Sequence, residues 1–395
     1  RTFVVGAGKA AASMALAVER HWPADAALAG LVVTRYAHGL PCTRIEVVEA
    51  GHPVPDAAGE DAAARILAHA RALDAEDLLL VLVSGGGSSL LSLPVDAVPM
   101  AELKTVTRQL LASGAPIQEI NVVRKHLSRI QGGRLAQATR ATVHVLVVSD
   151  VAGDDLSAIA SGPCAPDPST YRDALDVLAR WGIVPPAGVA AHLARGAAGA
   201  VDETPKPGDA VFARVEHRMI ATAHASLDAA ARVFEAAGVR AVVLGDTITG
   251  EAREVAQVLG AIAREVATRE RPFRRPVALI SGGECTVTVR GSGRGGRCAE
   301  FLLALVRALA DVPGVWALAA DTDGIDGSED NAGALLTPDT SARAAAAGLD
   351  ARRMLDDNDG YGFFSALGDL VVTGPTRTNV NDYRVILLLP ESAPG

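Results

Sequence analysis

Short hydrophobic runs alternate with longer amphipathic stretches along the whole chain. The runs are rich in Val, Leu and Ile, and the stretches repeat Ala, Leu and Arg with helical spacing. Strands and helices that alternate in this way are typical of a mostly parallel sheet covered by helices. In the first half, the predicted strands are 3–5, 31–34, 45–48, 78–83 and 143–148, and the predicted helices lie near 9–20, 57–73, 100–113, 117–130 and 171–181.

A second series of strands follows a polar stretch rich in Pro and Gly, residues 199–208, which is the best candidate for a linker. It separates predicted domains at 1–205 and 206–395, and two domains are what a chain of 395 residues favours. The strands near 280 and 288 are so close in sequence that we predict an antiparallel pair and therefore a mixed second sheet. The predicted strands of this half are 219–222, 241–244, 277–280, 286–289, 315–319, 370–373 and 384–389.

Composition excludes several classes of function. The net charge is −9 and no domain carries a basic excess, which argues against a nucleic-acid partner. No apolar run approaches the roughly 18 residues of a membrane span. Four cysteines without CxxC spacing favour a reducing cytoplasm over a disulfide framework or a zinc site. The first residues lack a signal-peptide layout, and because the chain does not begin with Met we expect residues upstream.

The strongest chemical signal is the loop after the hydrophobic strand 78–83. Consecutive glycines permit positive φ and expose successive backbone N–H groups, which form a concave anion site. Serine hydroxyls add donors, and ligands of open α/β sheets bind at this end of the strands. We therefore predict a phosphate or carboxylate site rather than a turn that merely needs glycine. The loop consists of Ser84, Gly85, Gly86, Gly87, Ser88 and Ser89.

The loop after the first strand reads Gly6-Ala-Gly-Lys-Ala-Ala and matches the G-x-G-x-x-A pattern of dinucleotide sites. The acidic residue expected after the second strand is missing, since residues 31–34 run into Arg35. Either Arg35 binds the 2′-phosphate of NADP, or this is another kind of phosphate loop into which Lys9 reaches. Lysine is rare in this chain and opposes the dipole at a helix N-terminus, so we predict a functional Lys9.

The predicted helix 117–130 carries polar and basic residues at three- and four-residue spacings, so they share one face. Such a face can bind a nucleotide polyphosphate or a small carboxylate, or it can simply be solvated. Both interpretations stay open in so acidic a chain. The residues are Asn121, Arg124, Lys125 and Ser128.

Aspartates follow predicted strands in both halves of the chain. Asp150 comes after strand 143–148, and Asp321 and Asp323 follow strand 315–319. Carboxylates at strand ends suit Mg²⁺ or a substrate hydroxyl, so we predict these three as metal ligands. Phosphoryl transfer requires mainly positioning and charge neutralisation, which these loops can supply. Further predicted ligand-binding residues in the second half are Gly282, Gly283, Glu284, Arg297, Thr376 and Asn379.

Taken together, these motifs resemble the glycerate 2-kinases, class II glycerate kinases whose C-terminal part carries the MOFRL motif. The resemblance spans nearly the whole chain, in order. It rests on Gly6-Ala-Gly-Lys-Ala-Ala, Gly51-His-Pro-Val-Pro-Asp, Ser84-Gly-Gly-Gly-Ser-Ser, Ile120-Asn-Val-Val-Arg-Lys-His-Leu-Ser, Ser149-Asp-Val, Ser161-Gly-Pro, Ser281-Gly-Gly-Glu, Gly295-Gly-Arg, Asp321-Thr-Asp-Gly-Ile-Asp-Gly and Thr373-Gly-Pro-Thr-Arg-Thr-Asn-Val-Asn-Asp.

The resemblance implies two non-similar three-layer α/β/α domains. The first would be Rossmann-like with a mainly parallel sheet, and the second, MOFRL-type, would have a mixed sheet, with the active site in the cleft between them. It also implies ATP-dependent phosphorylation of D-glycerate at the 2-hydroxyl, with Mg²⁺ or another divalent cation. Lys9 corresponds to the family's active-site lysine and Arg297 to the arginine of its Gly-Gly-Arg motif, and we add Asp150 as a third catalytic candidate.

One departure from the family pattern matters for ligand binding. Family members continue the Gly-Gly-Arg motif with Asn-Gln-Glu, whereas this chain has Cys298, Ala299 and Glu300. If the two replaced side chains touch ligand, affinity or specificity will differ. If they only start the helix, little changes.

Two other functions stay open at this point. An NADP-dependent hydroxypyruvate reductase fits the first loop and Arg35 but leaves residues 84–89 and Arg297 without a role. A non-catalytic protein that binds glycerate or a nucleotide would have the sites without turnover. The expected partners are the small molecules D-glycerate and ATP, with neither nucleic acid nor membrane, and the sequence is compatible with a homodimer.

Overall fold

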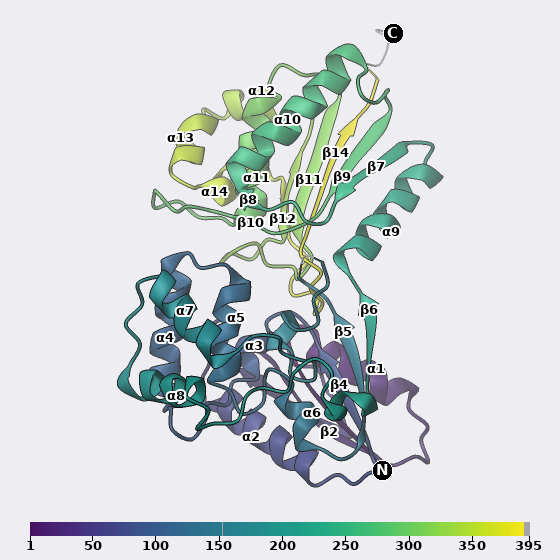
Figure 1. Cartoon of the computed structure of the whole chain (residues 1–395). Coiled ribbons are helices and arrows are strands. Elements are labelled where there is room, and N and C mark those ends of the chain that lie inside the picture. Colours follow the sequence, from purple (N-terminus) through teal and green to yellow (C-terminus); the bar gives the residue numbers. More distant parts are fainter. Residues whose placement is uncertain (152, 391–395) are drawn as a thin grey trace. The chain divides into compact units, whose positions relative to one another are not determined.

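The computed structural model describes residues 1–151 and 153–390, which fall into two compact α/β units. The first unit is Arg1–Ile220 and the second begins at Ala221 (Figure 1). The boundary lies later than the predicted 205/206, because strand β6 (Val215–Ala221) joins the sheet of the first unit. Among the described helices, none is long and apolar enough to cross a membrane.

The first unit is built on a six-stranded sheet with the order β3-β2-β1-β4-β5-β6. The sheet grows in one direction from β1 to β3 and in the other from β4 onward, so the loops after β1 and β4 are neighbours at a topological switch point. Ligands of open α/β sheets bind at such points. The parallel strands, all predicted from the sequence, are β1 (Thr2–Ala7), β2 (Leu28–Arg35), β3 (Ile45–Ala50), β4 (Leu78–Val83) and β5 (Thr142–Val148).

Two groups of helices complete the first unit. Helices α1 (Ala11–His21), α2 (Ala57–Arg71) and α6 (Arg134–Ala138) flank the sheet, and Ile66 of α2 shares a hydrophobic core with Leu79 and Val81 of β4. The other group forms a cluster with its own core, which includes Leu103, Val123 and Leu178. This second group, visible together in Figure 1, consists of α4 (Met100–Ser113), α5 (Ile117–His126), α7 (Tyr171–Arg180) and α8 (Ala187–Ala197).

The predicted linker at 199–208 is wrong, because polar side chains attach this stretch to the first unit. Glu203 accepts a hydrogen bond from the backbone N–H of Tyr171 (2.9 Å) and lies 3.2 Å from the ring of His126. Thr204 donates to the buried carboxylate of Asp167 (3.0 Å). Pro and Gly are common in linkers, but here the intervening Glu, Thr and Lys make contacts that sequence spacing does not reveal. A 3₁₀ turn, η2 (Ala210–Arg214), follows this segment.

The second unit has a six-stranded mixed sheet with the order β13-β12-β11-β14-β9-β7, in which only β7 and β9 pair in parallel. The mixed sheet is confirmed, but the predicted pairing of the strands near 280 and 288 is wrong. Strand β9 already has β14 on one side and β7 on the other, so β10 (Cys285–Thr286) pairs instead with β8 (Gly250–Glu251) in a separate small sheet. The main strands are β7 (Arg240–Gly245), β9 (Val277–Ser281), β11 (Val315–Asp321), β12 (Gly333–Leu336), β13 (Leu370–Val371) and β14 (Asp382–Leu388).

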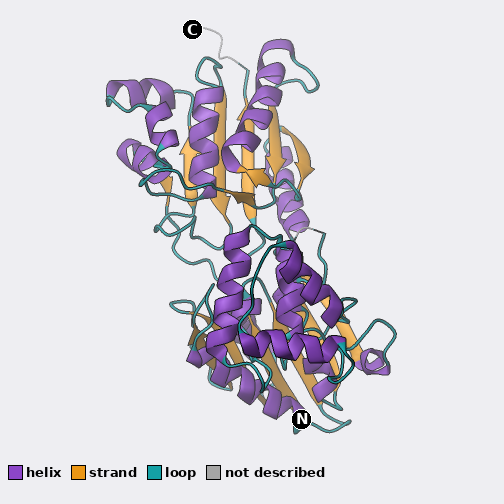
Figure 2. Ribbon diagram, turned by 60° about the vertical axis from the view of Figure 1, so that its left-hand side comes forward, coloured by secondary structure: helices purple, strands orange, loops and turns teal. Residues whose placement is uncertain are grey.

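Helices cover both faces of this second sheet (Figure 2), as expected of a three-layer unit. Val277 and Leu279 of β9 share a core with α10 and α11, whereas the alternate residues Ala278 and Ile280 pack with Leu227 of α9. This alternation follows from the two-residue period of a strand. The helices are α9 (Ala223–Ala236), α10 (Ala252–Arg269), α11 (Arg297–Ala308), α12 (Thr340–Ala346), α13 (Ala351–Asp356) and α14 (Gly360–Leu367).

Candidate functional site

In the first unit, hydrogen bonds hold the loops after β1 and β4 together. The backbone N–H of Lys9 donates to the carbonyl of Gly85 (2.8 Å), and that of Ala10 donates to the Ser84 hydroxyl (3.0 Å). Gly8 has φ +140°, and a Cβ at this position would lie 2.1 Å from Ser84 Oγ. Only glycine therefore allows the two loops to approach so closely.

These contacts bear directly on the dinucleotide interpretation. A pyrophosphate in such a site binds to open N–H groups at the start of the first helix. Here the N–H groups of Gly8, Ala10 and Ala11 donate to Val33 O (3.1 Å), Ser84 Oγ (3.0 Å) and Gly8 O (3.1 Å), and that of Lys9 is used by Gly85. Strand β2, the loop after β4 and the first loop itself therefore accept from the amides that a dinucleotide would need.

The loop after β4 has open donors instead. Within the part of the chain that the structure describes, the N–H groups of Gly85 and Gly86 make no hydrogen bond. Gly86 has φ +81°, and a Cβ there would lie 3.4 Å from Lys9 Cγ and 3.0 Å from the ring of His52. The loop therefore combines open amides with a neighbouring lysine, which suits an anion. The short helix α3 (Gly87–Leu90) follows it.

The serines of this loop have different surroundings. Ser84 is fully buried and accepts from Ala10, and the Ser89 hydroxyl donates to Gly86 O (3.2 Å). Ser88 is half-buried, and its hydroxyl lies 2.9 Å from the hydroxyl of Ser161. Two of the three serines therefore shape the loop, and Ser88 is the one best placed to meet a ligand.

Ser161 belongs to a strained turn that sequence reasoning did not assign to the site. Ala160, Ser161 and Gly162 have φ values of 50°, 58° and 56°, a conformation that costs on the order of 1–3 kcal/mol for a non-glycine residue. The Ser161 hydroxyl also contacts Oδ1 of Asn121 (3.1 Å), whose amide donates to Ala158 O (3.2 Å). Through the Ser161 hydroxyl, the turn thus helps to fix the position of the Ser88 side chain. The Ser-Gly-Pro motif was the one signal of this turn in the sequence.

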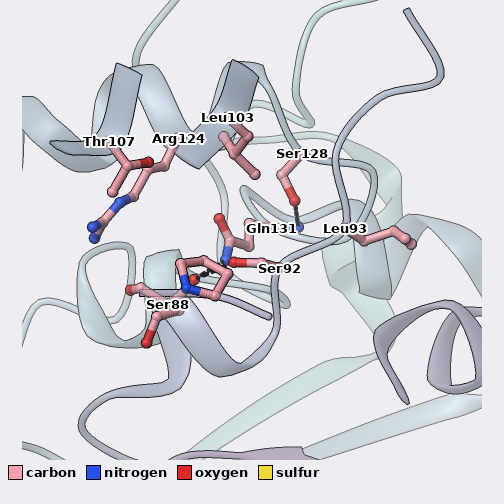
Figure 3. Close-up of a pocket in the computed structure, with 10 residues that line it drawn as sticks. Ser88, Ser92, Leu93, Leu103, Thr107, Arg124, Ser128 and Gln131 are labelled. Atoms are coloured by element: carbon pink, nitrogen blue, oxygen red, sulfur yellow. Dashed lines mark hydrogen bonds between the residues drawn. The ribbon is translucent and has the colours of Figure 1, made fainter. Parts of the chain in front are cut away.

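Arg124 of α5 faces a small cavity beside this loop (Figure 3). The cavity measures about 10 Å³, roughly the space of one water, and Ser88, Thr107 and Ser128 also line it. Burial lowers the pKa of Arg124 to about 10, which leaves the guanidinium charged at neutral pH. No described residue forms a hydrogen bond or ion pair with this side chain. A desolvated cation without a carboxylate indicates a place for an anionic ligand.

The neighbouring Lys125 is different. Its ammonium lies 3.4 Å from Oδ1 of Asp167, and both side chains are buried. Asp167 also accepts from Ser169 (2.6 Å) and Thr204. The predicted single polar face is therefore divided: Arg124 and Ser128 line the cavity, whereas Lys125 is held within the fold.

Asp150 lies two residues beyond β5 and is partly exposed. Strands β4 and β5 are parallel, with Val83 opposite Val147, so Asp150 and the Ser84 loop leave the sheet at the same edge. The prediction that Asp150 meets a ligand at this edge is consistent with its position.

In the second unit, chain direction gathers the charged residues at one edge of the sheet. Strands β11 and β14 are antiparallel, and the last residue of β11, Asp321, lies opposite the first of β14, Asp382. Helix α11 begins at Arg297 beside them. Asp382 was not among the predicted site residues, because its position beside Arg297 depends on pairing between distant strands.

Carboxylates surround the Arg297 guanidinium. Its Nε donates to both carboxylate oxygens of Asp382 (2.9 and 3.0 Å), and Nη2 donates to Oδ2 of Asp321 (2.7 Å). Nη1 lies 3.4 Å from the carboxylate of Glu284, whose side chain is 55% exposed. The two aspartates are almost fully buried, so the arginine is held mainly on the side that faces the protein interior.

Burial and crowding change the acidity of this cluster. Burial raises the pKa of Asp321 to about 7 and that of Asp382 to about 6, against the opposing effect of Arg297. Although burial opposes it, the attraction of Asp382 and Asp321 raises the pKa of Arg297 above its ordinary value. Two buried carboxylates thus share one cation, and Asp321 can carry a proton near neutral pH.

The start of α11 explains the departure at Cys298 and Ala299. Both side chains are buried, and Cys298 belongs to the hydrophobic core. Their backbone N–H groups donate to the carboxylate of Asp326 (3.0 and 2.8 Å), which therefore caps the helix that carries Arg297. In this chain the two positions start the helix and face the core.

The other predicted residues of this unit bind neighbouring loops together. Asp323 accepts from the N–H of Ile325 (2.8 Å), and its carbonyl accepts from the N–H of Thr376 (3.0 Å). The Asn379 side chain accepts from the N–H of Asn381 (3.3 Å). Gly282 and Gly283 follow β9, and Gly283 O accepts from the N–H of Asp382 (3.3 Å). These contacts order the loops, and ligand contacts at these residues stay predictions.

The predicted metal site has no preformed cluster. Over residues 1–151 and 153–390, no three His, Cys, Asp or Glu side chains are grouped so as to hold a metal ion. Asp321 bonds Arg297, and Asp323 bonds backbone. Mg²⁺ in nucleotide sites is usually held by one or two carboxylates together with phosphates, so the metal-ligand roles of Asp150, Asp321 and Asp323 stay predictions.

Among the described residues of this α/β protein, the edge of the first sheet has amides without hydrogen bonds and an arginine without a partner, and the edge of the second has an arginine held by carboxylates. Residues 1–194 match a domain family of unknown function (DUF4147), and residues 277–382 match the MOFRL family. The chain is 49% identical to a putative hydroxypyruvate reductase of Agrobacterium vitis, over 98% of this chain and 87% of that one.

Other relatives are named as kinases. The chain is 40% identical to a glycerate 2-kinase of Pyrococcus horikoshii over 98% of this chain and 87% of the relative. The crystal structure of a glycerate kinase from Thermotoga maritima superposes with a TM-score of 0.88 at 40% identity, covering 98% of this chain and 92% of that one. This chain belongs to the MOFRL-containing glycerate kinase family, as its motifs predicted.

Proposed function

We propose that this protein transfers the γ-phosphoryl group of ATP to the 2-hydroxyl of D-glycerate, giving 2-phospho-D-glycerate and ADP. Full-length relatives at 40% identity carry the names glycerate 2-kinase and D-glycerate 2-kinase. The observation that carries the proposal is the first sheet edge, where the open amides of Gly85 and Gly86 lie beside the charged Arg124, which has no partner among the described residues. Both substrates are anionic, and such donors suit phosphate and carboxylate groups.

The reductase alternative is less well supported by the same edge. Its name comes with 49% identity, which is higher than that of the kinases. Hydride transfer from NADPH bound in a Rossmann-type site requires the pyrophosphate of the cofactor on the amides that start α1. Those amides donate within the protein, to Val33, Gly85 and Ser84. A dinucleotide would have to break these bonds, whereas the loop after β4 is open.

Three charged residues have proposed roles in the reaction. The glycerate 2-hydroxyl oxygen attacks the γ-phosphorus, the bond to the β-phosphate oxygen breaks, and the hydroxyl proton passes to a carboxylate or to water. Lys9 and the loop after β4 would bind phosphate or carboxylate oxygens. Arg297 would neutralise charge on the transferred group. Mg²⁺ would lower the charge of the ATP phosphates, and Asp150 is its proposed ligand in the first unit. The cleft between the units stays a prediction.

Two parallel assays test the proposal. The protein is incubated with ATP, Mg²⁺ and D-glycerate, and separately with NADPH and hydroxypyruvate. We expect ADP release in the first and no NADPH oxidation in the second. Enolase converts 2-phosphoglycerate directly, whereas 3-phosphoglycerate needs a mutase first, so coupling to enolase alone identifies the hydroxyl. NADPH oxidation without ADP release would overturn the kinase assignment, and glycerate binding without either turnover would identify a non-catalytic binding protein.

Lys9→Ala serves as the inactive control, since loss of a phosphate-binding lysine should abolish most turnover. Because Cys42, Cys164, Cys285 and Cys298 are all free thiols, we place the enzyme in the cytoplasm.

A further inference from the structure

We propose that Asp382 is a positioning residue that fixes the guanidinium of Arg297 for phosphoryl transfer, a role that rests on the proposed kinase function. Asp382 makes the most extensive contact with this arginine. Nε donates to both of its oxygens at 2.9 and 3.0 Å, and Nη2 lies 2.9 Å from Oδ1. Paired contacts of this kind restrict both the place and the plane of a guanidinium.

Asp382 is itself held on several sides. It begins β14 opposite Asp321, and its N–H donates to Gly283 O (3.3 Å). Oδ2 lies 3.9 Å from the buried guanidinium of Arg384, which in turn donates to Cys285 Sγ (2.7 Å) and Ile248 O (3.2 Å). With a side-chain exposure of 1%, the carboxylate has no room to turn away from Arg297.

This arrangement determines which edge of Arg297 can meet a ligand. A guanidinium has five N–H donors in a fixed plane. Nε and Nη2 point at the buried aspartates, whereas the partner of Nη1 among the described residues is the largely exposed Glu284, at 3.4 Å. A phosphoryl oxygen can therefore replace Glu284 at Nη1 without disturbing the buried contacts. Asp382 positions Arg297 before the ligand arrives, so little reorganisation is needed in the transition state.

The same unit contains a matched pair for comparison. Arg343 Nη2 donates to Oδ2 of Asp369 at 2.7 Å, and Nη1 donates to Oδ1 at 3.2 Å. Asp369 has a side-chain exposure of 12%, and its partner Arg343 is not among the proposed site residues. Asp369→Asn therefore removes an arginine–carboxylate pair of similar geometry without touching the proposed site.

Steady-state kinetics of Asp382→Asn and Asp369→Asn test the role. We expect Asp382→Asn to lower kcat by about 10- to 100-fold, as loss of an orienting partner commonly does, with KM for glycerate changed less than about threefold. Asp369→Asn should keep the wild-type kcat. A second readout is chemical rescue of Arg297→Ala. Millimolar guanidinium should restore part of its activity, and methylammonium should restore much less. The double variant Arg297→Ala/Asp382→Asn should not be rescued by guanidinium.

The outcomes separate the two proposals. Wild-type protein without ADP release would overturn the kinase function and this role with it. An active wild type together with wild-type kcat in a folded Asp382→Asn, or equal rescue with and without Asp382, would overturn the positioning role alone. If Asp382→Asn does not fold, the rescue of Arg297→Ala decides: equal rescue by guanidinium and methylammonium would show that no carboxylate orients the planar group.

Discussion

The two sheet edges place their arginines in opposite electrostatic surroundings. Arg124 of the first unit is charged and partly buried and has no carboxylate partner among the described residues. Arg297 of the second unit has two buried carboxylates and one exposed carboxylate within 3.4 Å. Burial of Arg124 without a carboxylate has a desolvation cost that an anionic ligand can offset. At Arg297, the buried carboxylates offset much of this cost and also fix the orientation of the guanidinium.

This difference suggests a division of labour. A cation without an internal partner gains most when a ligand supplies the negative charge, so it contributes to binding. A cation that is already neutralised gains less from ground-state binding. It can contribute where additional charge develops in the transition state, provided that its geometry is fixed. We therefore expect changes at Arg124 to affect mainly KM and changes at Arg297 to affect mainly kcat.

The largest expected effect is that of Arg297→Ala on turnover. An arginine that stabilises a transferring phosphoryl group contributes about 10³-fold or more to kcat. We expect a loss of this size with a small change in the KM values for ATP and glycerate. Initial-rate measurements over both substrates give the two parameters separately.

Arg343→Ala is the matched control for this prediction, because it also removes an arginine from a carboxylate pair in the second unit. Its kcat should equal that of wild type. Asp321 and Asp382 lose their partner in Arg297→Ala, so the variant could be unfolded. A cooperative transition in a thermal melt shows that it is folded. A folded Arg297→Ala with wild-type turnover would contradict the proposed division.

Lys125→Met tests the claim that the neighbour of Arg124 is structural. The substitution leaves Asp167 buried without its cation, which should lower the free energy of unfolding by about 3 kcal/mol or more. At a temperature where the variant is folded, KM and kcat should be unchanged. Urea unfolding followed by circular dichroism measures the first quantity. A higher KM with unchanged stability would return Lys125 to the ligand site.

Arg124→Ala should have the reverse profile. Loss of a charged hydrogen bond to an anionic substrate costs about 1.5–3 kcal/mol, which raises KM for that substrate by roughly 10- to 150-fold. Stability should fall little, since the arginine forms no ion pair with any residue that the structure describes. Arg129→Ala, at a half-buried arginine paired with the exposed Asp96, is the control and should leave KM unchanged. Whichever substrate shows the higher KM is the one whose anionic group Arg124 contacts.

Much of the fold could be predicted because local patterns determine it. The five parallel strands of the first sheet are short hydrophobic runs, and the glycine loops follow them directly. The parallel arrangement then brings Lys9, the Ser84 loop and Asp150 to one edge without further information. In the second unit the mixed sheet was also recognisable, although the partner of β9 was not.

What the sequence did not reveal depends on contacts between distant segments. Asp382 lies 85 positions from Arg297 in sequence, and only antiparallel pairing of β11 and β14 brings it to Asp321. Lys125 and Arg124 are adjacent in sequence, but the docking of residues 199–208 near Asp167 separates their roles. The motif of Ser161 was visible, whereas its left-handed backbone and its contact with Ser88 were not.

The smallest expected effect concerns the proton that the Arg297 cluster can carry. Asp321 has a pKa of about 7 in the folded protein, because burial outweighs the attraction of Arg297, and an ordinary value of 3.8. Between these values the folded state binds more protons than the unfolded state, so the free energy of unfolding should fall as pH rises through this window. Above the folded pKa the fall should level off.

Asp321→Asn removes this titrating group, so the free energy of unfolding of the variant should decrease less with rising pH than that of wild type. Urea unfolding at about pH 5 and about pH 8 compares the variant with wild type, since the window lies between the two pKa values. Trp316 is the tryptophan of the second unit, so Trp22→Phe/Trp181→Phe makes fluorescence report on that unit. Equal slopes in both proteins would show that Asp321 stays ionised and that the attraction of Arg297, rather than burial, determines its charge. In that case Arg297 would be more fully neutralised at neutral pH, and the contrast with Arg124 would be sharper.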